Sequence, residues 1–199
     1  MTGKSGPFLA ILTALVTFFS AVTPARATSD GLIAHWKLDE SSGTTAADSK
    51  GGNDGTLGNG PVWQPSGGKI GGAVSLDGTD DYISIANESN FDFEHTDPFS
   101  ISAWIYRDTN NSEDDIFEKV DGAFGWRGYA LWMAQSDNNV RFDITAGSGS
   151  YMSIITTGDT VPLGTWIHVV AIYDGSSTGA GMKIYINGVE ASTTASGSF

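Results

Sequence analysis

The chain of 199 residues is long enough for one domain, or for one domain and a tail. It has no cysteine, which excludes disulfides and thiolate chemistry, and its formal net charge of −13 argues against nucleic acid or anionic lipid as a partner. The 26 glycines and 11% aromatic residues predict short strands joined by tight turns.

The N-terminus has the pattern of an export signal, predicted to cover residues 1–27. Lys4 supplies a positive charge, residues 8–22 form an uncharged apolar run, and Ala25-Arg26-Ala27 is a small-x-small cleavage site. A membrane anchor is the alternative, but a spanning helix needs about 20 apolar residues, and this run is shorter. We therefore expect a mature chain from Thr28, with 8 basic and 23 acidic residues, that is secreted or held at the cell surface without membrane insertion.

Almost every later segment is an apolar or alternating run between turn residues, so helices are not expected. The mostly apolar run 166–173 predicts a central strand buried on both faces. Asn187-Gly188 predicts a type I′ hairpin turn, and residues 41–68 a long surface loop with at most one short strand. The expected strands are 32–38, two within 74–85 joined by a turn, 99–106, 115–120, 129–134, 139–144, 151–155, 166–173, 182–186 and 189–191.

Five segments occur in a familiar order: "GLIAHWKLDESSG", "AVSLDGTDDYISI", "FSISAWIY", "GTWIHVVAIYDG" and "MKIYINGVEA". Together they resemble the laminin-G-like, concanavalin-A-like jelly-roll domains of bacterial secreted proteins, over residues 31–191. The resemblance implies that residues 28–199 form an all-β jelly-roll sandwich of two antiparallel sheets.

The chain end departs from this family. Such domains continue into a last strand of the type G-x-I-D-E-V-R-I-Y beside the first strand, whereas this chain ends "STTASGSF". We therefore expect the domain to lack its final strands, with a loose chain from Ser192 and an unpaired sheet edge beside strand 32–38. The chain would then be part of a larger multidomain protein.

Glu113, Asp115 and Glu118 match the E-x-D-x-x-E spacing of laminarinase- and lichenase-like β-glucanases, which share the jelly roll. In retaining enzymes of this kind, one carboxylate is the nucleophile and another the acid/base. Glu113, however, follows a polar loop, and we expect it to project from a turn, so no catalytic residue is predicted. The three histidines have no metal-binding spacing, and His168 is expected to be a hydrogen-bonded core residue.

Two tryptophans lie in predicted loops, Trp63 and Trp126. Exposed loop aromatics stack on the apolar faces of sugars, and Arg127 beside Trp126 can donate hydrogen bonds to hydroxyl groups. These three residues are the predicted ligand-binding residues; the alternative is that both rings anchor their loops. The tryptophans inside strands are expected in the core: Trp36, Trp104, Trp132 and Trp166.

The segment "SLDGTDDYISI" (75–85) surrounds a glycine with three carboxylates. Asp-Gly favours a turn for backbone reasons alone. Calcium needs six to eight oxygen ligands, more than this loop supplies. In related jelly rolls a structural calcium ion lies between such a loop, the end of the first strand and an aspartate of the last strand. This resemblance implies Asp39, Asp77 and Asp80 as ligands here, without the last-strand aspartate. A simple turn and a shared Ca²⁺ site both stay open.

The sequence as a whole predicts an exported, non-catalytic recognition module that binds carbohydrate or an extracellular protein. One alternative is a glycoside hydrolase or polysaccharide lyase that uses Glu113 and Glu118 on the same fold. A second alternative is a structural spacer in a larger surface protein, which would lack an exposed aromatic cluster.

Overall fold

The computed structural model describes residues 31–110, 113–134, 137–147, 149–197 and 199, so the expected signal segment lies outside the described residues. Strands dominate these described ranges, with three short 3-10 helices between them. No helix in the described ranges is long and apolar enough to cross a membrane. The strands are β1 (Thr45–Ala46), β2 (Gly55–Gly58), β3 (Val62–Gln64), β4 (Ala73–Ser75), β5 (Tyr82–Ile85), β6 (Phe99–Tyr106), β7 (Asp114–Asp121), β8 (Arg127–Met133), β9 (Val140–Gly147), β10 (Ser150–Thr156), β11 (Trp166–Tyr173), β12 (Met182–Ile186), β13 (Val189–Glu190) and β14 (Thr193–Gly197), and the helices are η1 (Glu88–Phe91), η2 (Gly122–Phe124) and η3 (Gly179–Gly181).

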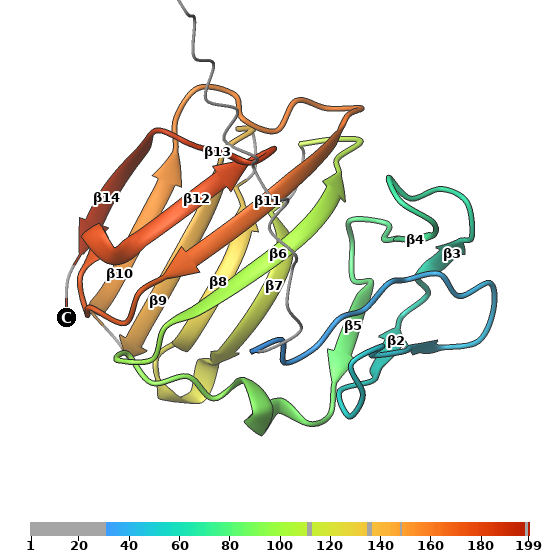
Figure 1. The fold of residues 1–199 in the computed structure, drawn as a ribbon, viewed down its shortest axis with the longest axis horizontal. Coiled ribbons are helices and arrows are strands. Elements are labelled where there is room, and N and C mark those ends of the chain that lie inside the picture. The colour runs from blue at the N-terminus through green and yellow to red at the C-terminus, as the bar shows by residue number, and fades with distance from the viewer. Residues whose placement is uncertain (1–30, 111–112, 135–136, 148, 198) are drawn as a thin grey trace, which may run out of the picture. The chain divides into compact units, whose positions relative to one another are not determined.

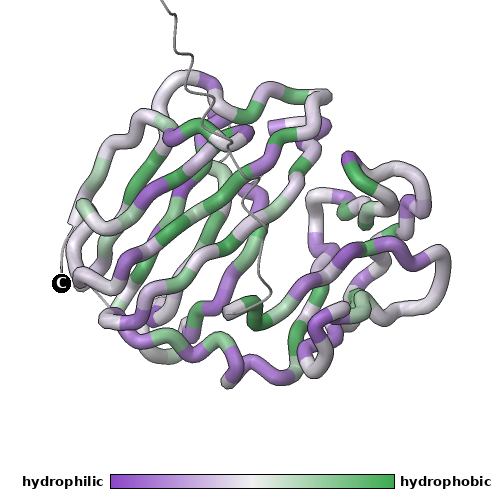
Figure 2. The backbone as a smooth tube through the Cα atoms, viewed as in Figure 1, coloured by the Kyte–Doolittle hydropathy of each residue, from purple (hydrophilic) through white to green (hydrophobic). Residues whose placement is uncertain are grey.

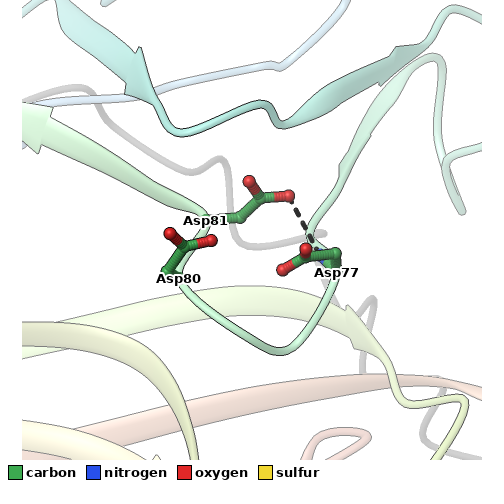
Figure 3. A group of neighbouring side chains, drawn as sticks. All are labelled: Asp77, Asp80 and Asp81. Carbon is green, nitrogen blue, oxygen red and sulfur yellow. Dashed lines mark hydrogen bonds between the residues drawn. The ribbon is translucent and has the colours of Figure 1, made fainter.

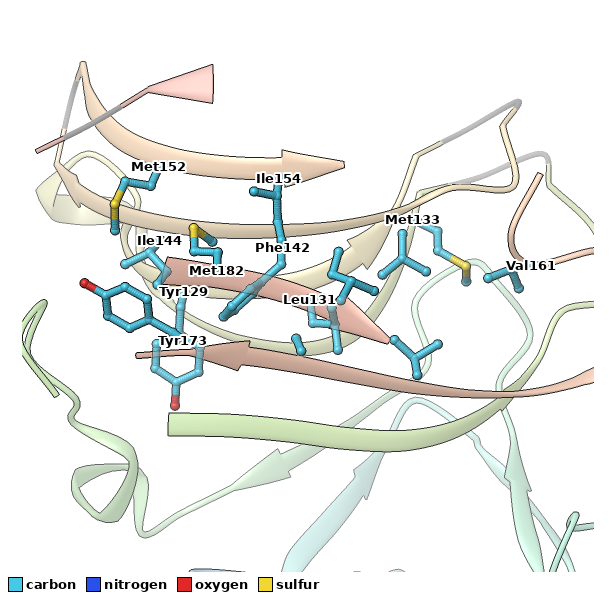
Figure 4. Close-up of a cluster of buried hydrophobic side chains, with 14 of the residues drawn as sticks. Tyr129, Leu131, Met133, Phe142, Ile144, Met152, Ile154, Val161, Tyr173 and Met182 are labelled. Carbon is cyan, nitrogen blue, oxygen red and sulfur yellow. The ribbon is translucent and has the colours of Figure 1, made fainter. Parts of the chain in front are cut away.

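Two antiparallel sheets form the sandwich that the sequence predicts (Figure 1). One has five strands in the order β14-β10-β9-β8-β7, and the other has four in the order β13-β12-β11-β6. Buried side chains from β8, β9 and β10 pack against those from β11 and β12, which makes one core between the sheets (Figure 4). The predicted fold class, an all-β sandwich of two antiparallel sheets, is therefore confirmed.

Successive side chains of a strand point to opposite faces of its sheet, so every second residue is buried. On β8, Tyr129, Leu131 and Met133 are buried, and the residues between them are half-buried on the outward face. On β9, Val140 and Phe142 are fully buried in the same way. Hydrophobic and hydrophilic residues accordingly alternate along the sandwich strands (Figure 2).

The N-terminal part of this unit differs from the prediction. Residues 32–38 form no strand; their one ladder contact is the isolated bridge between Trp36 and Asp48. The segment 41–68, expected as a loop, contains β1, β2 and β3. β4 and β5 pair not with each other but with β3 and β2, in separate small sheets. Trp36 connects this region to the sandwich, since its ring lies 6.0 Å from Phe91 and 6.4 Å from Phe117.

The C-terminal part also differs. Residues after Ser192 were expected to be loose, but Thr193–Gly197 form β14 and pair with β10 along its whole length, from Thr156↔Thr193 to Met152↔Gly197. The hairpin turn is as predicted, with Asn187 at φ 51° and Gly188 at φ 82° between β12 and β13.

The prediction that Trp104, Trp132, Trp166 and His168 lie in the core is wrong. Trp104 and Trp166 point outward from the four-stranded sheet together with His168, and Trp132 points outward from the five-stranded sheet. The aliphatic residues between them fill the core instead, such as Ile167 and Val169 on β11. β11 lies inside the sheet, as predicted, but it was expected to be buried on both faces, and its outward face is only half-buried.

Candidate functional site: the outward face of the five-stranded sheet

A β-bulge in β7 determines which carboxylates this face presents. Asp115 pairs with Trp132 and Glu118 with Ala130, but the register shifts by one residue between Asp115 and Phe117. Because of this extra residue, Asp115 and Glu118 point to the same side, where Trp132 and Ala130 also lie. The glucanase-like spacing found in the sequence thus becomes a spatial cluster.

Two adjoining hollows lie on this face. The first has a volume of about 360 Å³; its walls include Glu113, Asp115, Glu118, Trp126, Trp132 and Asp143. The second, of about 340 Å³, shares Trp126, Asp143 and Thr145 with the first and extends to Tyr151 and Ser153 on β10. We call the two together the groove. It runs across β7, β8, β9 and β10.

The groove is acidic. Burial, and then the charges of Glu113 and Asp114, raise the pKa of the Asp115 carboxyl above its ordinary value. Burial, and then the charge of Asp115, raise the pKa of Glu118 in the same direction. Among the ion pairs of the described residues, none involves Asp115 or Glu118. These two carboxylates therefore remain available to a ligand.

Hydrogen bonds fix the floor of the groove. The indole Nε1 of Trp132 donates to Asp143 Oδ2 at 2.7 Å, and the Arg141 guanidinium lies 5.3 Å from the centre of the Trp132 ring. Arg141 in turn pairs with Asp137 at 2.8 Å. The second oxygen of Asp143, Oδ1, is buried and has no hydrogen-bond partner within the described residues. This oxygen has almost no accessible surface, so it lies beneath the groove and does not line it.

Trp126 stands at the junction of the two hollows. It is 66% exposed, and its backbone has a left-handed φ of 64°, which is unusual for a bulky residue. Gly125 just before it is also left-handed, at φ 76°. A strained backbone that holds a large apolar ring in water is typical of a binding site.

The other two predicted ligand residues lie elsewhere or face away from the hollows. Arg127 begins β8, lines neither hollow and has Glu94 as its nearest ionic partner, at 3.8 Å. Trp63, on β3, donates from Nε1 to the carbonyl of Gly43 at 2.8 Å and lines neither hollow. Of the three, the structure therefore brings only Trp126 into the groove, together with Trp132, Asp143 and Tyr151, which the sequence did not single out.

The predicted metal ligands fall into two groups. Asp77 and Asp80 lie together with Asp81, with a carboxylate oxygen of each within 4.8 Å of the others (Figure 3). The loop is held by internal bonds, because Asp81 Oδ2 accepts from the Asp77 N–H at 3.0 Å. Asp39 is bound elsewhere: its Oδ1 accepts from the Gly72 N–H at 2.7 Å.

Comparison with models of protein families agrees with this architecture. A laminin-G-type family model, described as "Concanavalin A-like lectin/glucanases superfamily", matches residues 77–198. Among solved structures, the crystal structure of the botulinum neurotoxin serotype C1 binding domain aligns with 79% of this chain at 19% identity and a TM-score of 0.49. The alignment covers 39% of that toxin chain. No curated protein sequence matches. Since the family match covers more than half of the chain and includes every strand of the sandwich, the chain belongs to the concanavalin A-like lectin/glucanase superfamily.

Proposed function

We propose that the chain is an exported, non-catalytic recognition module that binds a carbohydrate in the groove. The observation that carries the proposal is the exposed, left-handed Trp126 at the junction of two hollows lined by carboxylates and hydroxyls. Sites for small polar ligands combine aromatic walls with a few well-placed polar groups, and the groove has both. The superfamily includes lectins, which is consistent with this function.

A sugar ring would stack its apolar face on Trp126. Its hydroxyl groups would donate to the carboxylates of Asp115 and Glu118, while the Ser153 hydroxyl can donate or accept. Ala130 separates Glu118 from Asp143 along one row of the sheet, so its small side chain leaves room between the two carboxylates. An extracellular protein is the other ligand class for this face.

Titration of the protein with soluble glycans tests the proposal. Trp126→Ala should weaken binding about tenfold or more, because the stacking platform is lost. Trp63→Ala is the matched control, since it removes an equal ring outside the groove and should change affinity less than about twofold. Equal losses in the two variants, or no binding of any glycan in a broad panel, would refute the groove as the carbohydrate site.

A glycoside hydrolase or polysaccharide lyase is the second candidate. The bulge supports it, since it brings Asp115 and Glu118 to one face beside Glu113, with pKa values raised as an acid catalyst requires. Incubation with laminarin and lichenan, followed by analysis of reducing ends, decides between the candidates. Turnover that is lost in both Glu113→Gln and Glu118→Gln would establish catalysis; we expect none.

We further propose that Asp77 and Asp80 bind a structural calcium ion, with Asp81 as a third carboxylate from the same loop. Carboxylates are hard oxygen ligands that suit calcium, and Asp39 would join only if it left its bond to Gly72.

Export, a location outside the cell or on its surface, and membership in a larger multidomain protein remain proposals that rest on the N-terminal sequence pattern and the family resemblance.

A further inference from the structure

The outward face of the four-stranded sheet, on the other side of the sandwich from the groove, is unusually aromatic. β6 presents Trp104 and Tyr106 on this face, and β11 presents Trp166 and His168. Trp104 and Tyr106 are 39% and 45% exposed. We call these four residues the aromatic face. The solvent face of an antiparallel sheet usually carries polar side chains, so four neighbouring aromatic rings on such a face indicate a binding surface.

Neighbouring contacts hold these rings in place. Tyr106 and Trp166 are register partners, and their ring centres lie 5.5 Å apart. Trp104 and His168 are also partners, with ring centres 5.0 Å apart, and His168 Nε2 is hydrogen-bonded to the Ser102 hydroxyl at 2.8 Å. Two aromatic pairs thus follow each other along the strands at a spacing of about 7 Å, two residues of an extended chain. The rings of the two pairs are tilted against each other, by 52° and 30°, and the Ser102 hydroxyl lies beside them.

The outward residues of this sheet carry few charges, and the Asp39 carboxylate is held at the β3–β4 turn by the Gly72 N–H. Among the outward residues of β6, β11, β12 and β13, Glu190 is the sole carboxylate, and Lys183 pairs with it at 3.0 Å. Lys69 extends from the turn between β3 and β4 to lie 5.7 Å from the centre of the Trp104 ring. No ion pair among the described residues involves Lys69. In a chain of net charge −13, this face therefore offers an unneutralised cation.

We propose that the aromatic face is a second binding site, and that its ligand is an acidic polysaccharide, a glycan whose sugar units carry carboxylates. Sugar rings stack on the Tyr106–Trp166 pair, and a sugar carboxylate binds Lys69 through a charge-assisted hydrogen bond. The charge selects this ligand class: the groove, with Asp115, Glu118 and Asp143, repels a polyanion, whereas the aromatic face attracts one. The site is independent of the carbohydrate site proposed in the groove.

Titration calorimetry with a galacturonic acid oligomer tests the site, with the fully methyl-esterified oligomer as the uncharged matched ligand. The acidic oligomer should bind, added salt should weaken it, and the ester should bind about tenfold more weakly. Lys69→Ala and Tyr106→Ala should each raise Kd about tenfold. The matched controls Lys37→Ala and Tyr82→Ala remove an exposed lysine and an exposed tyrosine elsewhere, and should leave Kd within about twofold.

Three results would overturn the proposal. The first is equal binding of the acid and its ester, or no binding of either. The second is an equal loss of affinity in the controls. The third is a dimer in sedimentation that dissociates in Tyr106→Ala, which would assign the face to a second copy of the chain. Trp126→Ala distinguishes the two sites: it should leave binding of the acidic oligomer unchanged even if the groove fails as a carbohydrate site, and a loss there would move the oligomer to the groove.

Discussion

Asp115 and Glu118 point to the same side of β7 although three positions separate them, because the bulge after Asp115 inserts one residue into the alternation. In a regular strand, one of the two carboxylates would point toward the core. The bulge thus adds a negative charge to a face that already carries Asp143, at a cost in electrostatic repulsion.

Glu118→Gln should therefore raise the melting temperature at neutral pH. A carboxyl group whose pKa is higher in the folded than in the unfolded protein destabilises the fold when it is ionised. Removal of its charge should therefore increase the free energy of unfolding, a gain in stability. This gain is present above the folded pKa and disappears as pH falls below the ordinary value of 4.5. Thermal melts of both proteins across this range measure it.

Glu94→Gln is the control, because it neutralises an exposed carboxylate outside the groove. It should not stabilise the protein at neutral pH. A melting temperature gain in Glu118→Gln that persists at acid pH would show that the negative charge of Glu118 is not its cause.

Asp48→Asn should destabilise the protein above pH 4. Asp48 is 6% exposed, and burial alone raises its pKa, but hydrogen bonds from the His35 and Lys50 N–H groups and the Asn53 side chain outweigh burial, so the pKa is lowered. The stability that the carboxylate contributes is present above its ordinary pKa of 3.8 and is lost as pH falls through the lower folded pKa. Denaturant unfolding should show that the difference in unfolding free energy between the two proteins becomes smaller below pH 3.8. A difference that does not change with pH would contradict a stabilising role of the Asp48 carboxylate.

Asp114→Ala should cost about 3 kcal/mol of unfolding free energy. Arg107 is 4% exposed and bonds to Asp114 at 2.6 Å, while its Nη1 donates to the Asp137 carbonyl at 2.6 Å. Removal of the carboxylate leaves a buried guanidinium charge without its counter-charge, because the carbonyls of Asp137 and Ala134 that also accept from it are neutral. Arg127→Ala, which breaks a solvent-exposed 3.8 Å pair, should cost no more than about 0.5 kcal/mol. Similar losses in the two variants, measured by urea denaturation, would contradict this difference.

Calcium should raise the melting temperature, because an ion that binds only the folded state stabilises it by mass action. Asp80→Asn should abolish the increase, whereas Asp108→Asn, an exposed carboxylate outside the cluster, should not. If Asp39→Asn also abolishes it, the site is shared between Asp39 and the loop. Identical melting in calcium and in chelator would exclude a calcium site here.

Local patterns predicted the sandwich strands well. β6 and β11 have the expected bounds, since each is an unbroken run of strand-forming residues between turns, and Asn187-Gly188 favours one backbone geometry by itself. β14 was missed because its Thr, Ala, Ser and Gly residues are all exposed and carry no apolar pattern. It is a strand because of its hydrogen bonds to β10, about forty positions earlier, and such pairing cannot be read from local sequence.

The groove was predicted in part. Trp126 was recognised from its loop composition, and the three acidic residues from their spacing. The bulge that unites Asp115 and Glu118 was not foreseen, because a bulge shows only when two strands are aligned. Asp143 was missed for a related reason: it joins Glu118 only through the pairing of β7, β8 and β9. The aromatic face was mistaken for core because hydrophobicity alone does not reveal the direction of a ring.

The left-handed backbone of Trp126 lowers the stability of the protein at a residue that the proposed ligand needs. A bulky residue at φ 64° costs about 1 kcal/mol, which glycine would avoid. Trp126→Gly should therefore yield a protein that is no less stable, yet one that has lost its proposed ligand. A selection for thermostable variants that measures only survival after heating would favour this change and lose ligand binding. Such a selection therefore needs a binding assay as well.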